Sequence, residues 1–310
     1  PGFTAVAVLT LALGIGANSA IFTLVNGFIL RPLPWPQPHR VVGLYNESTV
    51  ASGSYRPFSY PNYREIRGQN KAFENVLAHS LVMAGLTEAE STRRLIADCV
   101  SANYFSTLGV RLARGRVFTT DEEMPGAELP VVIVSHKFWQ KAGGSQDYLG
   151  QTIRVNGRPY TVVGITTPEF TGTMALFSPE LWLPLGVYES IRNDIASGKG
   201  RRLDDRDSHA LLLAGRLKPG ITVAAAASEL KVLGDQMARA HPKEDRDWTV
   251  TTSPLPRMGF TGKPDKGSEL GSLAFLLMGM AGMVLLIACL NLANMLLARG
   301  SARRKEMAVR

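Results

Sequence analysis

Two neighbouring residues, Ser135 and His136, are of the types that form a nucleophile and its general base. The histidine must reach the serine hydroxyl for this chemistry, but adjacent residues on an extended chain point to opposite faces. No His-Glu-x-x-His motif occurs, and no metal-ligand spacing links the other histidines, which are His39, His79, His209 and His241. We therefore expect that the chain is not an enzyme and carries no metal or cofactor of its own.

Nucleotide binding is the second chemistry that the sequence could support. The string nearest to a Walker motif begins at Gly259, but its spacing is wrong and Pro264 stands where the motif requires a hydroxyl. Gly14-Ile-Gly16 resembles the start of a dinucleotide fingerprint, but it lies inside an apolar run with no strand before it. We expect no nucleotide hydrolysis by this chain alone.

Charge is distributed very unevenly along the 310 residues, although the net charge is only +8. Asp, Glu, Lys and Arg are absent from residues 1–30 and from residues 270–298. A helix of about 20 apolar residues crosses the hydrocarbon core of a bilayer, so both runs predict membrane spans. An interfacial or buried helix and a signal peptide remain alternatives for the first run. The pattern excludes a single soluble globule, a disordered chain and binding to nucleic acid through bulk charge.

The end of the chain, residues 299–310, is strongly basic. Lys and Arg next to a span favour the cytoplasmic side of the membrane. Two spans return the chain to its starting side, so residues 31–269 are predicted to lie across the membrane. The expected location is therefore the bacterial inner membrane, with several passes and the large domain in the periplasm.

Small and amide side chains within the spans could pack helices together. Ala12, Gly16 and Ala20 recur every fourth residue, a pattern that lets two helices approach closely in lipid, although ordinary small residues would look the same. Asn291 and Asn294 are three residues apart in the second span, where they could bond to a neighbouring helix or reach the membrane interface.

The two ends of the extramembrane segment have matching patterns. After a Pro-rich exit at 31–40, expected to be extended, a short apolar run at 41–45 is followed by a predicted helix at 60–66 and by predicted strands at 76–83 and 94–100. Towards the other end, a strand from His209 precedes Thr222, a candidate N-cap for an Ala-rich helix, and residues 248–252 predict a further strand. Two β-α-β units are therefore expected to pair into one subdomain, formed by 41–110 and 209–253.

The intervening segment, 111–208, predicts an inserted and mostly β subdomain. Val131-Val-Ile-Val is typical of a buried strand, and Asn156-Gly157 between apolar runs is a strong hairpin signal. The charged stretch 190–206 is expected to be an exposed loop, and residues 254–269 a linker back to the membrane. The predicted fold class is thus an α+β periplasmic domain between transmembrane helices at 1–30 and 270–298.

Several strings resemble one family in their order and spacing. They are Pro1-Gly-Phe-Thr-Ala-Val-Ala-Val-Leu-Thr, Leu30-Arg-Pro-Leu-Pro-Trp, Val100-Ser-Ala-Asn-Tyr-Phe, Val134-Ser-His-Lys-Phe-Trp, Leu149-Gly-Gln-Thr-Ile-Arg-Val-Asn-Gly-Arg-Pro-Tyr and Ala288-Cys-Leu-Asn-Leu-Ala-Asn. These strings resemble the MacB-like (FtsX-superfamily) permeases of ATP-binding-cassette (ABC) transporters, most closely the duplicated orphan permeases of acidobacteria. Because relatives have at least two further spans, the chain is expected to be a fragment.

The resemblance implies a permease in which a separate ATPase subunit binds ATP and moves the membrane helices together with a porter-like periplasmic subdomain. The implied partners are the ABC ATPase, the membrane, and a second permease copy or duplicated half. They can also include a periplasmic adaptor and an outer-membrane channel, but not nucleic acid. An FtsX-type periplasmic adaptor or regulator without transport is the alternative, and a tethered periplasmic enzyme is a third hypothesis.

Charged residues beyond the second span are predicted to dock on the ATPase, because the family places its coupling contact nearby. A simple anchor at anionic lipid headgroups is the alternative. The residues concerned are Arg303, Arg304, Lys305, Glu306 and Arg310.

Overall fold

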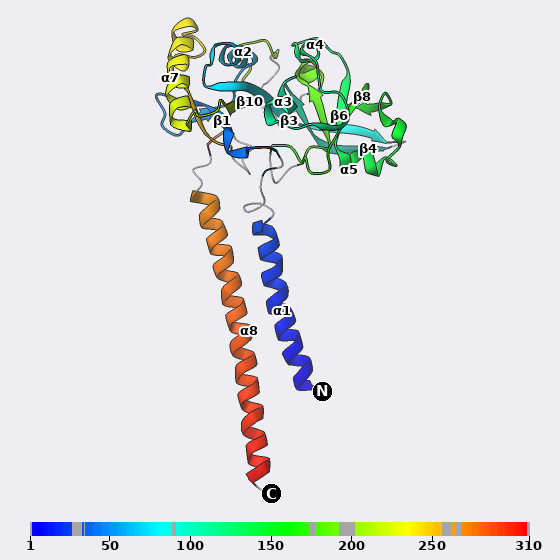
Figure 1. Cartoon of the computed structure of the whole chain (residues 1–310), viewed down its shortest axis with the longest axis vertical. Coiled ribbons are helices and arrows are strands. Elements are labelled where there is room, and N and C mark those ends of the chain that lie inside the picture. Colours follow the sequence, from blue (N-terminus) through cyan, green and yellow to red (C-terminus); the bar gives the residue numbers. More distant parts are fainter. Residues whose placement is uncertain are drawn as a thin grey trace. The chain divides into compact units, whose positions relative to one another are not determined.

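The computed structural model describes residues 2–26, 33, 35–88, 91–173, 178–191, 202–255, 262–264 and 268–308. The chain divides into two compact units. The first is a helical unit formed by Pro1–Arg31 and Lys266–Arg310, and the second is a mixed domain formed by Pro32–Asp265 (Figure 1).

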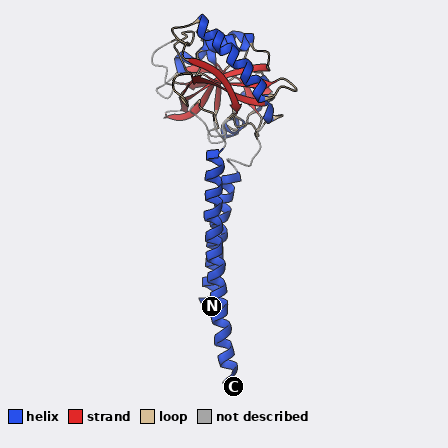
Figure 2. Cartoon of the chain, turned by 90° about the vertical axis from the view of Figure 1, so that its left-hand side faces the viewer, coloured by secondary structure: helices blue, strands red, loops and turns tan. Residues whose placement is uncertain are grey.

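The helical unit consists of α1 (Gly2–Val25) and α8 (Ser268–Ala308), which lie side by side in both views (Figures 1 and 2). The two helices are antiparallel, so the start of α1 and the end of α8 lie towards the same end of the pair. Within α8, the segment Phe275–Met295 is long and apolar enough to cross a membrane. The apolar stretch described in α1 is shorter, Val8–Thr23, so the first span remains a prediction.

The centre of the mixed domain is built from two interlaced β-α-β units. One is formed by β1 (Val41–Ser48), α2 (Tyr60–Gln69) and β3 (Phe73–Glu88), and the other by β10 (Leu212–Leu217), α7 (Val223–Ala240) and β11 (Trp248–Pro254). The strand order is β11-β1-β10-β3, and each neighbouring pair is antiparallel. Each unit therefore has two parallel strands with one strand of the other unit between them. This is the split β-α-β arrangement.

The remaining strands extend the same sheet. β4 (Ser91–Val100) follows β3, and after it come β9 (Leu181–Pro184), β6 (Val131–Val134), β8 (Arg158–Thr166) and β5 (Leu112–Gly115). β2 (Tyr55–Arg56) pairs with β1, and β7 (Thr152–Val155) pairs with β3 and β8. Because β4 and β9 pair directly, the sheet runs through both segments of the predicted division. Separate porter-like and inserted subdomains therefore remain a prediction.

Short helices complete the domain. They are α3 (Tyr104–Leu108), α4 (Thr120–Glu123), α5 (His136–Lys141), α6 (Tyr188–Ile191) and three 3-10 turns, η2 (Pro38–Arg40), η3 (Gln146–Tyr148) and η4 (Leu185–Val187).

Alternation along the strands creates a core on each face of the sheet, because successive side chains of a strand point to opposite faces. In β6, Val132 and Val134 join one core while Ile133 joins the other. In β9, Leu181 and Leu183 are likewise separated from Trp182. The first core is covered by apolar residues of α2 and α7, and the second by those of α3, namely Tyr104, Phe105 and Leu108.

Local signals in the sequence explain where several elements begin. The side chain of Thr222 accepts a hydrogen bond from the Ala225 N–H and caps α7, as predicted. Ser59 and Asn62 form a capping box at the start of α2. Asn156 and Gly157 have φ angles of 50° and 77°, so the predicted tight turn between β7 and β8 is confirmed.

Two expectations for loops are wrong. The exit at 31–40 is not extended in its described part, because it bends at residues 35–37 and closes a 3-10 turn at Pro38–Arg40, with Trp35 buried in the core. The charged stretch 190–206 is not simply exposed either: the Leu203 side chain is fully buried, and ion pairs hold Arg206 against the domain. Residues 192–201 lie outside the described part of the chain.

Candidate functional site

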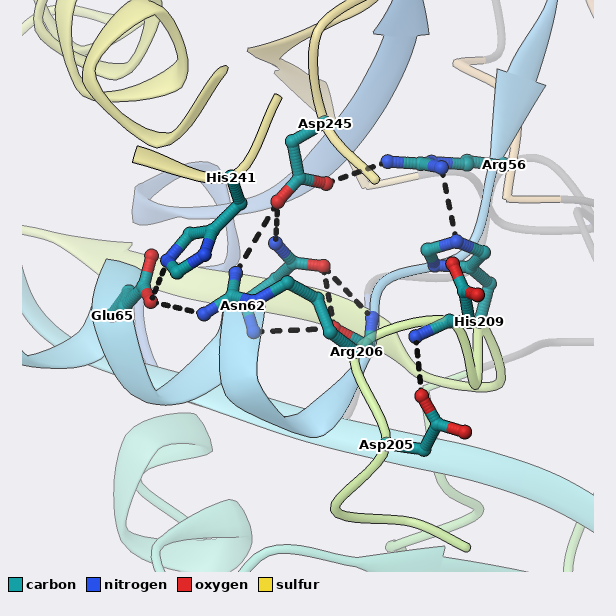
Figure 3. Close-up of polar contacts among 10 residues, drawn as sticks. Arg56, Asn62, Glu65, Asp205, Arg206, His209, His241 and Asp245 are labelled. Carbon is teal, nitrogen blue, oxygen red and sulfur yellow. Dashed lines mark hydrogen bonds and ion pairs between the residues drawn. The ribbon is translucent and has the colours of Figure 1, made fainter. Parts of the chain in front are cut away.

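A network of buried and half-buried charges connects α2, the segment 205–209 and the connection between α7 and β11 (Figure 3). Its centre is Asp245, whose carboxylate accepts hydrogen bonds from Arg56 at 2.7 Å, Asn62 at 3.0 Å and Arg206 at 3.2 Å. The Asp245 side chain is only 5% exposed, so these three donors replace the water that a carboxylate otherwise requires.

Glu65, on α2, is the second acid of the network. It accepts hydrogen bonds from Arg206 and, at 3.2 Å, from Nε2 of His241. Arg206 therefore bridges Glu65 and Asp245, as Figure 3 shows. One side chain of the 205–209 segment is thereby held by acids from two other parts of the domain.

Arg56 closes the other side of the network. Its guanidinium lies 4.2 Å from the centre of the Trp248 ring, and Nη1 lies 2.9 Å from Nε2 of His209. Because arginine only donates, this nitrogen of His209 is the acceptor in the contact. Burial lowers the pKa of Arg56, and the charge of Asp245 opposes this effect.

The network consists of ion pairs and hydrogen bonds that join separate segments of the domain. Its acids are paired with arginines, and the serine that it contacts, Ser59, donates its hydroxyl to Oδ1 of Asn62 at 2.6 Å and caps α2. Across the described ranges of the chain, no three His, Cys, Asp or Glu residues are grouped so that they could hold a metal ion. The network therefore holds three segments of the domain together.

Ser135 and His136 do not form a nucleophile-base pair. The Ser135 hydroxyl accepts a hydrogen bond from the Phe138 N–H at 3.1 Å and caps α5. The His136 ring instead packs edge-on against Trp139, with centroids 5.3 Å apart.

A buried acid-base pair lies inside the second core. Nδ1 of His79 is 3.1 Å from Asp98, and the Tyr104 hydroxyl donates to Asp98 at 3.4 Å. Burial, together with the charge of Asp98, raises the pKa of Tyr104 well above its usual value. Since all three side chains are enclosed, the set has no access for a substrate.

A surface groove of about 890 Å³ lies between β3, β4, α5 and β7. Leu86, Phe138, Tyr148 and Ile153 contribute apolar surface to it. Of its charged side chains, Arg93 pairs with Glu88 at 3.3 Å and with Glu180, outside the lining, at 2.7 Å. Lys141 and Arg154 also line the groove, so its lining is amphipathic with more basic than acidic side chains.

The predicted coupling residues Arg303, Arg304, Lys305 and Glu306 belong to α8, and Arg310 lies outside the described residues. The helix is 41 residues long, which corresponds to roughly 60 Å at 1.5 Å per residue. This is about twice the hydrocarbon thickness of a bilayer. The basic positions therefore continue the same helix past the apolar segment Phe275–Met295.

The predicted packing residues do not make the contact between α1 and α8. Ala12, Gly16 and Ala20 are exposed in the pair, as are Asn291 and Asn294. The contact is instead made at Gly14, where an added Cβ would lie 3.0 Å from Cβ of Ala288. Two residues correspond to about 200° of helical rotation, so Gly16 faces away from this contact. Packing of the predicted residues against other helices remains a prediction.

Comparison with protein families gives a match over most of the chain. The family model described as MacB-like periplasmic core domain matches residues 4–233. The probable syringafactin export ATP-binding/permease protein SyfD of Pseudomonas syringae pv. tomato is 27% identical over 212 residues, which are 68% of this chain and 28% of that protein. The macrolide export ATP-binding/permease protein MacB of Aggregatibacter actinomycetemcomitans is 22% identical over 313 residues, covering 97% of this chain and 44% of that protein. The chain therefore spans less than half the length of these relatives.

A solved structure shares the fold of the mixed domain. The crystal structure of a domain of a protein named as a permease from Porphyromonas gingivalis has a TM-score of 0.53 and 16% sequence identity. It covers 76% of this chain and 98% of that domain. At this identity the similarity establishes the fold alone.

Proposed function

The chain belongs to the MacB-like family of ABC transporter permeases, and from this premise we propose that it couples ATP hydrolysis on a separate ATPase subunit to movement of its mixed domain. The proposed role is mechanotransmission for export. ATP is bound by the partner, and this chain contributes the helices and the domain that they move.

The observation that carries this proposal is the pairing of β1 with β11. β1 begins at Val41, a short distance in sequence after α1, and β11 ends at Pro254, before α8. The two strands are antiparallel neighbours, with Val42 opposite Pro254. Both connections to the helical unit therefore leave the domain from one end of the same strand pair. A displacement of either helix would act on this pair, and the continuous sheet would carry it further.

The length and composition of α8 support the proposed contact with an ATPase in the cytoplasm. Its apolar segment Phe275–Met295 continues without a break into the basic positions up to Ala308. A stiff helix that emerges from the bilayer with Arg303, Arg304, Lys305 and Glu306 on its last turns suits a coupling contact with an ATPase. We therefore propose an inner-membrane location, with residues 31–269 in the periplasm and residues 299–310 in the cytoplasm.

The family also suggests the wider assembly. We propose that a second permease copy or a duplicated half completes the membrane part, and that a periplasmic adaptor and an outer-membrane channel can follow it. Relatives are named for macrolide and syringafactin export, which supports export as the activity. The FtsX-type regulator without transport is the less favoured reading, because the matched curated relatives are named as export proteins.

The coupling contact can be tested by charge reversal in the full-length protein. Arg303→Glu together with Arg304→Glu should abolish co-purification of the ATPase subunit from native membranes, because a favourable charge contact becomes repulsive. The matched control is Lys231→Glu with Arg239→Glu, which reverses two exposed charges on α7.

The control variant should retain the ATPase at the wild-type level. Membrane insertion of both variants is checked by carbonate extraction. Unchanged ATPase recovery with the α8 variant, inserted normally, would reject a coupling contact at these residues and favour the lipid-anchor alternative.

A further inference from the structure

The guanidinium of Arg216 in β10 holds the chain segment that leads from α1 into the sheet. Nη1 and Nη2 donate to the Pro36 carbonyl at 3.3 and 3.2 Å. The same side chain donates from Nε to the Thr107 carbonyl at 2.6 Å and from Nη2 to the Leu108 carbonyl at 2.8 Å. Arg216 thus joins the exit segment to the last turn of α3.

Arg216 is unusual because its hydrogen-bond partners are carbonyl groups and not a carboxylate. The residue is 8% exposed, and burial and the charge of Arg40 lower its pKa. The last carbonyls of a helix lack partners within the helix and carry partial negative charge, so a cation placed there is stabilised. Burial of the guanidinium costs free energy that its hydrogen bonds must offset. Removal of these bonds would leave a buried charge without partners.

Arg40, at the end of the exit segment, makes the reverse contact. Its Nε donates at 3.0 Å to the carbonyl of Leu217, the residue directly after Arg216. Its Nη2 also pairs with Glu74 of β3 at 2.6 Å. The two segments therefore hold one another, each through an arginine that binds a carbonyl of the other. We call this pair of contacts the arginine clasp, formed by Arg40 and Arg216.

Apolar packing reinforces the clasp on the exit segment. Trp35 is 5% exposed and belongs to the core that also contains Phe105, Leu108 and Leu77. Gly109, which follows α3 with φ of 70°, lies beside the ring of Pro36, since a Cβ added to it would be 3.6 Å from Pro36 Cδ. The exit segment is consequently fixed to the sheet before β1 begins.

We propose that the arginine clasp is the point at which movement of the first helix is transferred to the central strands β10 and β3. This inference rests on the proposed function. The clasp lies on the connection between α1 and β1 and binds this connection to β10, the strand next to β1. It therefore restricts bending within residues 35–40. A loose segment at 35–40 would absorb a displacement, whereas a clasped segment passes it on to Arg216 and the sheet.

The test is hydrogen exchange on the full-length protein with its co-purified ATPase subunit, without nucleotide and with ATP plus vanadate. In the wild type, nucleotide should change amide exchange in residues 35–41 and in residues 212–217. In Arg216→Gln, exchange in 35–41 should rise on the order of tenfold in both states, because charged hydrogen bonds are lost. The nucleotide-dependent change in 212–217 should disappear while ATPase turnover continues.

A purely structural role would raise exchange but leave the nucleotide response of 212–217 in place, and this result would overturn the inference alone. If the wild type shows no nucleotide response anywhere in 32–265, the proposed function fails and the clasp has no movement to transfer. Arg239→Gln on α7 is the matched control and should behave as the wild type. Should Arg216→Gln fail to fold, Arg40→Gln, at a side chain 19% exposed, carries the same prediction.

Discussion

Gly14 of α1 lies directly against Ala288 of α8, so closely that a Cβ added to Gly14 would be 3.0 Å from the Ala288 Cβ. Both residues are buried within the helical unit. Asn18 donates from Nδ2 to the Gly14 carbonyl at 3.0 Å and so stays within its own helix. The α1–α8 contact thus depends on the absence of a side chain at one position of α1.

Gly14→Leu should therefore separate the helices, with a cost of about 1–3 kcal/mol for overpacking. Gly16→Leu is the matched control, because nothing lies within 4 Å of a Cβ at that position. The measurement is the free energy of unfolding in mixed micelles as the fraction of denaturing detergent rises. Equal destabilisation by both variants would contradict the contact at Gly14.

The charge network should respond strongly to the loss of its central acid. Asp245→Ala leaves Arg56 and Arg206 without their shared partner, and breaking a buried ion pair costs about 3–5 kcal/mol. Asp235→Ala, at an exposed position on α7, should change stability by less than about 0.5 kcal/mol. Urea unfolding of the two variants checks this expectation, and a similar small effect for both would show that the network stabilises little.

Local patterns in the sequence predicted the elements much better than their connections. Val131–Val134 was expected as a strand and is one, because four consecutive apolar β-branched residues suit a strand buried on both faces. By contrast, Asp245 is separated from Arg56 by 189 positions, and nothing near either residue indicates the pairing. The clasp likewise joins positions 180 apart, Pro36 and Arg216. Such contacts depend on strand order, which a single sequence does not reveal.

The predicted functional residues show the same limit. Charge and spacing place basic residues directly after Phe275–Met295, and their contact with an ATPase stays a prediction. The small residues Ala12, Gly16 and Ala20 follow a valid packing pattern, but the described contact uses Gly14. Which face of a helix meets a partner depends on the partner, and the pattern alone does not define it.

Acid should weaken the domain partly through Glu122. Burial alone would raise the pKa of this carboxyl, but hydrogen bonds from Arg116 and the Thr119 N–H outweigh it and lower the pKa below its usual value. A lowered pKa in the folded state adds stability above the unfolded pKa of about 4.3, and this stability is lost as the pH falls through the folded value. The excess stability of the wild type over Glu122→Gln should therefore shrink between neutral pH and pH values below 4.3. A constant difference across that range, measured by urea unfolding, would contradict the ionised pairing with Arg116.

The outer strand β5 should not tolerate a side chain at Gly115. This residue has φ of 81°, and an added Cβ would lie 2.1 Å from the Val163 carbonyl oxygen. Gly115→Ala should destabilise the domain by about 1–3 kcal/mol more than Gly53→Ala, which has φ of 75° and open space. The shared positive φ makes this pair a test of the close approach alone. Equal melting temperatures for the two variants would contradict the packing of β5 on β8.

The proposed coupling requires that the mixed domain and the basic end of α8 lie on opposite sides of the inner membrane, since only then can an ATPase act on the domain through the helices. Alkaline phosphatase, which is active only in the periplasm, can be inserted at the exposed turn at Gly143 or fused after Arg310. We predict high activity for the insertion at Gly143 and background activity for the fusion after Arg310. High activity after Arg310 with none at Gly143 would contradict this orientation.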